Sequence, residues 1–312
     1  MIGQIANRLL LSIPVLFGVL LLGFMLLQLV PGDPAVVLAG PAAPPEVLDA
    51  IRKDMGLDQP VLVQFWHYLS RVAGGDMGRS LISNKTVLSE LGGAIVPTVE
   101  LMVGCLFWSI PLGIGMGTLA AVKRGSIIDR LVMALSVGGV SLPIFFICLL
   151  AIQFFGVYWP IFPFIGRGGP FWTYDGFMHL VLPAVSLGLI FIGPVARMTR
   201  SSVLEVLKLD HVRTARAKGL SERSVILRHG LRNALIPVVT LVGLQAGYLL
   251  GGAIVTETIF SWPGIGRLAV GAILSSDFPV AQGTILVLAL SFIVINLIVD
   301  VLYALLDPRV QG

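Results

Sequence analysis

Long apolar stretches alternate with polar segments along this chain. Six of the stretches are long enough to cross about 30 Å of hydrocarbon as helices, which rise 1.5 Å per residue. They cover residues 9–30, 95–122, 131–159, 178–197, 233–256 and 280–306. Because apolar residues run continuously instead of alternating with polar ones, the pattern favours helices over the strands of a barrel. It predicts an all-α integral membrane protein with six transmembrane helices.

Composition supports a membrane location. Of the 312 residues, 56% are hydrophobic and only 12% are charged, whereas soluble domains carry about 25% charged residues. We therefore expect membrane lipid to be the solvent for much of the chain. The net charge of +4 is explained by basic cytoplasmic loops, so no nucleic-acid partner is predicted.

The predicted helices divide the chain into three parts. Residues 1–30 form an N-terminal transmembrane helix, which is too long to be the apolar core of a cleaved signal peptide. Residues 31–94 form an outer loop region with an amphipathic helix around Glu46–Met55. Residues 95–306 hold the other five helices, with a cytoplasmic loop at 198–232 between the fourth and fifth.

The distribution of Lys and Arg predicts the orientation. Fourteen of the 21 lie at the termini, in the 123–130 and 198–232 segments, or, for Arg197, at the edge of the latter segment. Only Arg167 and Arg267 lie in the opposite short loops. Cytoplasmic loops carry the excess of basic residues in membrane proteins. Both termini of this multi-pass protein are therefore expected in the cytoplasm.

Residues that could carry catalysis or hold a metal are sparse. The sequence contains no Walker-type phosphate loop, no H-E-x-x-H and no G-x-S-x-G. Its four histidines, which lack the spacing of metal ligands, are His67, His179, His211 and His229. Cys105 and Cys148 lie in apolar runs and are expected to pack as small hydrophobic side chains. No catalytic, cofactor or metal site is predicted.

A few polar residues lie inside the predicted helices. Glu100 and Asp300 are ionisable, which is by default a sign of function in a membrane helix, although both are near helix ends and are also explained as structural. Gln153 and Gln245 are candidates for a translocation path or for bonds between helices. Repeated glycines predict close helix packing; they are Gly113, Gly117, Gly243, Gly247 and Gly251.

The 198–232 loop is the segment richest in basic residues. Its apolar residues Val203, Leu204, Val206 and Leu207 recur at helical spacing, and Gly219 is suited to end a helix. A short helix with small and basic residues fits docking into a cleft on a soluble partner. A solvated basic loop is the alternative that residue chemistry leaves open.

Several motifs give the chain a resemblance to a known family. They are Pro31-Gly32-Asp33-Pro34, Gly56-Leu57-Asp58-Gln59-Pro60, Gly75-Asp76-Met77-Gly78-Arg79-Ser80, Ser141-Leu142-Pro143, Ser261-Trp262-Pro263-Gly264-Ile265-Gly266-Arg267 and Asp307-Pro308-Arg309. In this order they resemble the peptide, glutathione and nickel branch of ABC-importer permeases. The resemblance extends over nearly the whole chain and implies a type I ABC-importer permease fold.

The resemblance also implies a coupling site, since residues 214–219 are similar to the branch's version of the motif that contacts the ATPase. Arg213 stands where the general importer motif has a glutamate. The implied ATPase-coupling residues are Asp210, Arg213, Thr214, Ala215, Arg216, Ala217, Lys218 and Gly219.

The implied partners are a second homologous permease subunit, two ATP-binding subunits, and a periplasmic or lipoprotein solute-binding protein. The implied solute is a short peptide or a related small molecule such as glutathione, a nickel chelate or an opine. A secondary transporter or channel that works without an ATPase is the alternative function.

Overall fold

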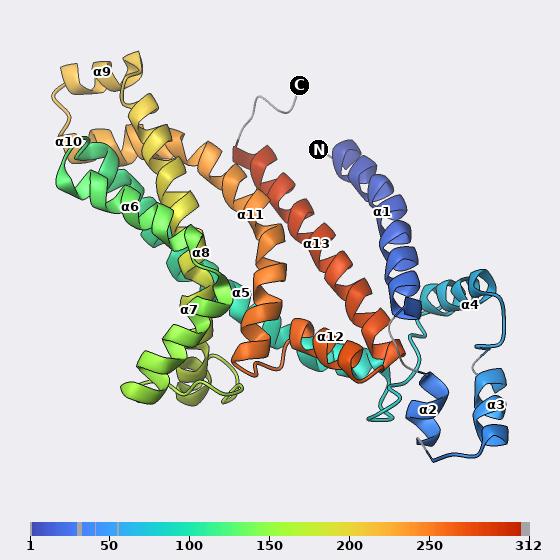
Figure 1. Ribbon diagram of the computed structural model, residues 1–312. Coiled ribbons are helices and arrows are strands. Elements are labelled where there is room, and N and C mark those ends of the chain that lie inside the picture. The colour runs from blue at the N-terminus through green and yellow to red at the C-terminus, as the bar shows by residue number, and fades with distance from the viewer. Residues whose placement is uncertain (1, 30–32, 41, 55, 307–312) are drawn as a thin grey trace. The chain divides into compact units, whose positions relative to one another are not determined.

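The computed structural model describes residues 2–29, 33–40, 42–54 and 56–306, and this part of the chain is built from helices joined by short loops (Figure 1). The helices of the first half are α1 (Ile2–Leu29), α2 (Pro34–Ala39), α3 (Pro45–Asp54), α4 (Val61–Ala73), α5 (Val87–Val122), α6 (Ile127–Ser141), α7 (Ile144–Ala151) and the π-helix η1 (Ile152–Tyr158). Those of the second half are α8 (Tyr174–Val206), α9 (Asp210–Ala217), α10 (Glu222–Ser224), the π-helix η2 (Val225–Leu231), α11 (Arg232–Ile259), α12 (Ile265–Leu274) and α13 (Phe278–Leu306).

Each of the six predicted stretches lies mainly in helix. By length and composition, four helical segments of the described chain qualify as membrane spans, and they are 87–122, 174–206, 222–245 and 278–299. The pair 127–139 and 144–158 forms a fifth candidate if it is one bent span. The first stretch falls in α1, where the described apolar part runs from Leu10 to Met25. The prediction of an all-α membrane protein is confirmed.

The expectation of one continuous helix over 131–159 is wrong. The helix ends at Ser141, and α7 begins at Ile144 after Leu142 and Pro143, both in extended conformations. A proline disfavours helical backbone at the residue before it and has no N–H to donate to the preceding turn. The Ser141-Leu142-Pro143 motif therefore breaks the third stretch.

Segment 31–94 is more helical than expected. The predicted amphipathic helix is present as α3, while Met55 lies outside the described residues. A further helix, α4, was not anticipated. Asp33 caps α2 by accepting a hydrogen bond from the N–H of Ala35, and Arg52 of α3 donates to the same carboxylate at 2.6 Å. The Arg52 guanidinium holds the pKa of Asp33 below its ordinary value.

The chain forms two compact units. The α8 unit contains residues 99–262 and α13 from residue 294, and the α12 unit contains residues 2–98 and 263–293. In the α8 unit, α8 packs against α6, α7 and α11. Its largest core cluster joins α5, α8 and α11 through Leu101, Leu187 and Leu249, with Trp262. Cys105 and Cys148 are free and fully buried in apolar clusters, as predicted.

Two of the repeated glycines allow α5 to approach α8 closely. A Cβ on Gly113 would lie 2.8 Å from the Val195 side chain, and one on Gly117 would clash with the backbone carbonyl of Ala196. The space that a Cβ on Gly243 would need is likewise occupied, by the side chain of Val299 of α13, but a Cβ on Gly251 would meet open space. Close packing is therefore confirmed at Gly113, Gly117 and Gly243, whereas no helix of the described chain packs closely at Gly251.

Alanine at position 117 is expected to destabilise the α8 unit by about 1–3 kcal/mol, because the methyl group would push α5 away from the backbone of α8. Gly115→Ala is the matched control, since its Cβ would meet open space on the same helix. Thermal unfolding of both variants in detergent tests this. Equal unfolding temperatures for the two would contradict the packing argument.

The α12 unit has two apolar clusters of its own. One joins the first turns of α5 to α12 and α13 through Leu91, Ile265 and Ala281. The other joins α1, α4 and α13 through Phe24, Phe65 and Leu286. The buried Asp277 carboxylate accepts hydrogen bonds from the Ser80 hydroxyl at 2.5 Å and the Leu81 N–H at 3.2 Å, which ties the turn before α5 to the start of α13.

Candidate functional site

The predicted docking segment forms a separate short helix, α9, after α8 ends. Four apolar residues that were expected to belong to the docking helix instead lie at the end of α8, with Val203, Leu204 and Val206 in its last turn and Leu207 directly after it. One face of α9 is anchored, because Val212 is fully buried and Ala215 is 5% exposed. These two side chains pack with Val225 of η2 and against the end of α8 at Leu207.

The opposite face of α9 is exposed. Seven of the eight predicted coupling residues are exposed, and they are Asp210, Arg213, Thr214, Arg216, Ala217, Lys218 and Gly219. The eighth, Ala215, points into the anchoring cluster. The side chains of Asp210 and Arg213 are 96% and 73% exposed, and 3.5 Å separates their charged groups.

Polar contacts fix how α9 is presented. Arg216 donates two hydrogen bonds to Glu222 of α10, at 2.8 and 3.3 Å, so its guanidinium is already paired within the chain. His211 of α9 and Asn233 of α11 are in hydrogen-bond contact at 3.3 Å. The α9 segment is thus tied to α10, η2 and α11 as well as to α8.

Gly219 ends this segment in a left-handed conformation. Its φ is +77°, its N–H donates to the carbonyl of Arg216, and a Cβ placed on it would meet open space. Glycine adopts this conformation without the steric cost that other residues bear. The sequence-based expectation that Gly219 terminates the helix is met by this geometry.

An ion pair links the two basic segments. Asp129, near the start of α6, accepts hydrogen bonds at 2.6 and 2.8 Å from Arg200 near the end of α8. It also accepts from the N–H of Gly125. The 123–130 turn and the end of α8 that leads to α9 therefore lie at the same end of the α8 unit. Figure 1 shows α9 at one end of this unit and α7 at the other.

Glu100 is paired, as its structural interpretation requires. Its side chain is 6% exposed and accepts two hydrogen bonds from Arg167, at 2.7 and 2.8 Å. Arg167 lies in the segment between η1 and α8, and the sequence identified it only as a loop charge. A bidentate pair of this kind is a strong charge-assisted contact. The side chain of Asp300 lies outside the described residues.

The candidate path residues are in different helices. Gln153 is exposed on η1 and Gln245 is half-buried on α11, and within the described residues no hydrogen bond joins the two amides. Sequence analysis missed Glu257, which is fully buried near the end of α11. It lies one residue beyond the predicted stretch 233–256, so only a longer estimate of that helix would have included it.

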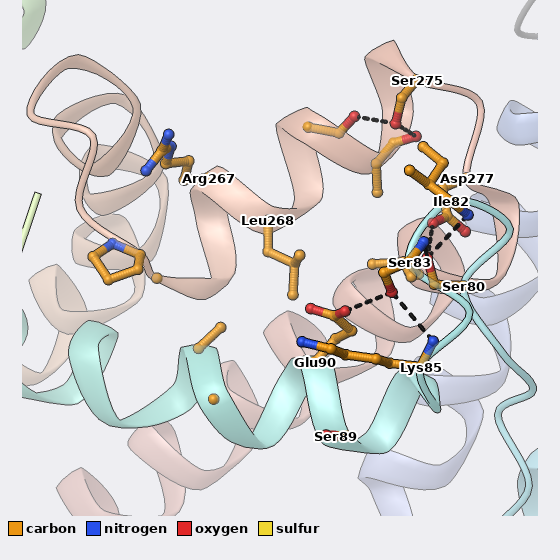
Figure 2. Close-up of a pocket in the computed structure, with 17 residues that line it drawn as sticks. Ser80, Ile82, Ser83, Lys85, Ser89, Glu90, Arg267, Leu268, Ser275 and Asp277 are labelled. Atoms are coloured by element: carbon orange, nitrogen blue, oxygen red, sulfur yellow. Dashed lines mark hydrogen bonds between the residues drawn. The ribbon is translucent and has the colours of Figure 1, made fainter.

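A cavity of about 600 Å³ with both polar and apolar walls lies in the α12 unit, between residues 80–94 and α12. Figure 2 shows Lys85 and Glu90 on one wall and Arg267 and Leu268 of α12 on the other. Ser83 donates a hydrogen bond to Glu90 at 2.7 Å. Both of the segments that form this cavity belong to loops for which an outward location is predicted. No cluster of three metal-ligating side chains occurs in the described part of the chain.

Comparison with known proteins assigns the chain to a family. Residues 110–312 match the family model of the binding-protein-dependent transport system inner membrane component, and residues 1–91 match the N-terminal model for such membrane components. The chain is 45% identical to the glutathione transport system permease proteins GsiC of Escherichia coli, Shigella flexneri and Salmonella typhimurium. Each alignment covers 100% of this chain and 99% of the relative.

Both matches agree with the all-helical membrane fold and with the motifs quoted above. Such a subunit resides in the bacterial inner membrane and has no catalytic activity of its own. The chain therefore belongs to the family of binding-protein-dependent inner membrane transport components and is a permease subunit of an ABC importer of the dipeptide and oligopeptide class.

Proposed function

We propose that this chain pairs with a second homologous permease subunit to form the translocation path of an importer for glutathione or a closely related short peptide. Two ATP-binding subunits supply the energy, and a solute-binding protein delivers the solute to the outer face. Membership of the family supports the assembly. Relatives that are 45% identical over the full length are named as glutathione permeases, which supports glutathione as the solute.

The coupling element in this proposal is α9. The observation that carries it is the two-sided character of the helix, with Val212 and Ala215 buried and Asp210, Arg213 and Lys218 exposed. A helix anchored in this way moves as a rigid body with the elements it packs on. Displacement of α9 by a closing ATPase would pass through Val225 to η2 and from there to α11.

The exposed face also suggests which contacts the ATPase makes. Arg216 is held by Glu222 at 2.8 Å, whereas Arg213 makes only a 3.5 Å contact with Asp210, and both of these side chains are exposed. We therefore assign the contact with partner carboxylates to Arg213 and Lys218. The short side chains of Thr214 and Ala217 permit close approach of the partner backbone.

We also propose that both termini, the 123–130 turn and α9 face the cytoplasm. The clustering of basic residues in these segments supports this, as does the Asp129–Arg200 pair that holds two of them together. An Arg223→Cys variant should react with a membrane-impermeant maleimide only after the cells are permeabilised. The native Cys105 and Cys148 are buried and give little background. Labelling in intact spheroplasts would overturn the orientation.

Transport in proteoliposomes tests the function. The chain is co-expressed with its partner permease and ATPase subunits, reconstituted, and supplied with the solute-binding protein and radiolabelled glutathione. We expect uptake that requires ATP and is inhibited by excess unlabelled glutathione. Excess dipeptides and nickel chelates serve as competitors that rank the alternative solutes.

Each alternative predicts a different result. Uptake driven by an ion gradient through this chain alone, without ATP, would support a secondary transporter and overturn the proposal. ATP-dependent uptake that only dipeptides inhibit would retain the importer and overturn glutathione as its solute.

A further inference from the structure

An apolar groove of about 600 Å³ lies in the α8 unit between the last turns of α5 and η2. Its walls include Ile114, Gly115, Leu119 and Val122 of α5 and Leu227 and Leu231 of η2. Leu119, Val122 and Leu227 are each between 44% and 49% exposed. Nothing in the described chain fills this space, and it lies against helices that qualify as membrane spans.

Basic residues follow directly on both walls of the groove. Lys123 and Arg124 come after Val122, Arg228 comes after Leu227, and Arg232 comes after Leu231. All four side chains are exposed, and none of them forms an ion pair within the described part of the chain. The groove is therefore lined by apolar side chains. Its basic neighbours are next to lining residues in the chain, with Lys123 and Arg124 directly after the end of α5.

We propose that the groove binds one anionic phospholipid of the cytoplasmic leaflet. An acyl chain fills the apolar walls, and the headgroup phosphate lies among Lys123, Arg124, Arg228 and Arg232. Basic pockets between membrane helices on the cytoplasmic side are suited to anionic headgroups, and a lipid chain needs no polar partner. The assignment goes beyond the transport function, and it uses the orientation proposed above only to name the leaflet.

The charge pattern favours a lipid over a helix of the second permease subunit. A partner helix would lie beside four exposed cations and would need carboxylates of its own to balance them, whereas an anionic lipid supplies the negative charge and the apolar tail in one molecule. Close helix pairs in membranes also need small residues on the contact face. On the α5 wall Gly115 and Thr118 are small, whereas Pro111, Ile114, Leu119 and Val122 are larger.

The position of the groove gives the lipid a consequence for coupling. It rests on Leu227 and Leu231 of η2, the π-helix whose Val225 packs against Val212 of α9. A bound lipid would hold η2 against the end of α5. Loss of the lipid would therefore loosen the support of α9 as well as the helix pair itself.

The test compares lipid binding by the full-length chain and its variants after delipidation in detergent. Phosphatidylglycerol or phosphatidylcholine is titrated in, and native mass spectrometry counts retained lipids while intrinsic fluorescence follows the unfolding temperature. One variant combines Lys123→Gln, Arg124→Gln and Arg228→Gln. A control variant, K53Q/R71Q/K85Q, removes the same charge from the α12 unit. A third variant, Gly115→Phe, fills the groove where a Cβ meets open space.

Phosphatidylglycerol should bind the native chain and the control variant and raise their unfolding temperature, while phosphatidylcholine should have little effect. The triple variant should bind phosphatidylglycerol about 100-fold more weakly, since each basic residue near an anionic headgroup contributes roughly a fivefold gain. Gly115→Phe should also lose the retained lipid although every charge remains.

Three results would overturn the proposal. Equal retention of the two lipids would show ordinary solvation of the helices. Undiminished binding by both the triple variant and Gly115→Phe would place the lipid elsewhere. Cross-linking of a cysteine at Leu119 to the second permease, with no lipid retained, would assign the groove to the subunit interface. If the triple variant fails to fold, Gly115→Phe still decides the question, because it leaves the charges and adds helix propensity.

Discussion

Arginine at position 219 is expected to abolish ATP-dependent transport while the chain still inserts in the membrane. Gly219 closes the exposed α9 segment at φ +77°, where its Cβ position faces open space and not the rest of the chain. A long cationic side chain there would project into the surface to which the ATPase is proposed to bind. Forcing extra volume into a packed contact costs about 1–3 kcal/mol, which corresponds to an association that is about 5- to 150-fold weaker.

Two controls separate this effect from backbone strain. Any residue with a side chain at a positive φ costs about 1–2 kcal/mol, so Gly219→Arg strains its own turn as well. Gly166 has a φ of +76° and the same open space, and it lies outside the α9 segment. Gly166→Arg should therefore introduce the same backbone strain but still bind the ATPase. Gly219→Asn, with a short side chain that tolerates this conformation, should bind the ATPase nearly normally.

Co-purification from detergent measures the outcome, with the ATPase subunits quantified against the permease. Loss of the ATPase from Gly219→Arg but not from Gly166→Arg supports docking at α9. Equal loss from the two variants would assign the effect to general instability, and normal association of both would remove the docking assignment.

The periodic features of the fold were predictable from sequence, because a continuous apolar run specifies a helix wherever lipid is the solvent. The ends of the helices were not. Helix α5 begins at Val87, eight residues before the apolar run at 95. The hydropathy pattern missed these residues because polar residues separate Leu88 from Leu91 and lower the local hydropathy. In α8, too, the helix extends past the apolar run through the basic residues Arg197 and Arg200.

The position of the candidate site in the sequence was predictable, but which of its side chains are exposed was not. The residues of α9 were identified from their resemblance to a family motif, which does not reveal which side of the helix is buried. Ala215 faces inward because it packs with Val225 of η2, and Arg216 is bound to Glu222 of α10. The pairing of Glu100 with Arg167 spans 67 positions, and no local pattern in the sequence connects two residues so far apart.

Removal of the Glu100 carboxylate is expected to produce the largest loss of stability among the ion pairs of the α8 unit. The pair is bidentate, and the exposed fractions of its side chains are only 6% for Glu100 and 20% for Arg167. Breaking a buried pair by deleting one partner costs about 3–5 kcal/mol, because the remaining charge stays buried without compensation. Glu100→Gln should lower the unfolding temperature by roughly 10 °C, and Arg167→Gln should have a similar effect.

The double variant, Glu100→Gln with Arg167→Gln, distinguishes a true pair from two independent contributions. With both charges removed, no uncompensated ion remains, so the double variant should be clearly more stable than the sum of the single losses implies. Unfolding of the four proteins in the same detergent completes the cycle. Additive losses would mean that the two side chains act separately. Strong coupling would mean that Glu100 is a structural anchor between α5 and the segment before α8. Its carboxylate would then not be free to carry protons, which favours transport driven by an ATPase over proton-coupled transport.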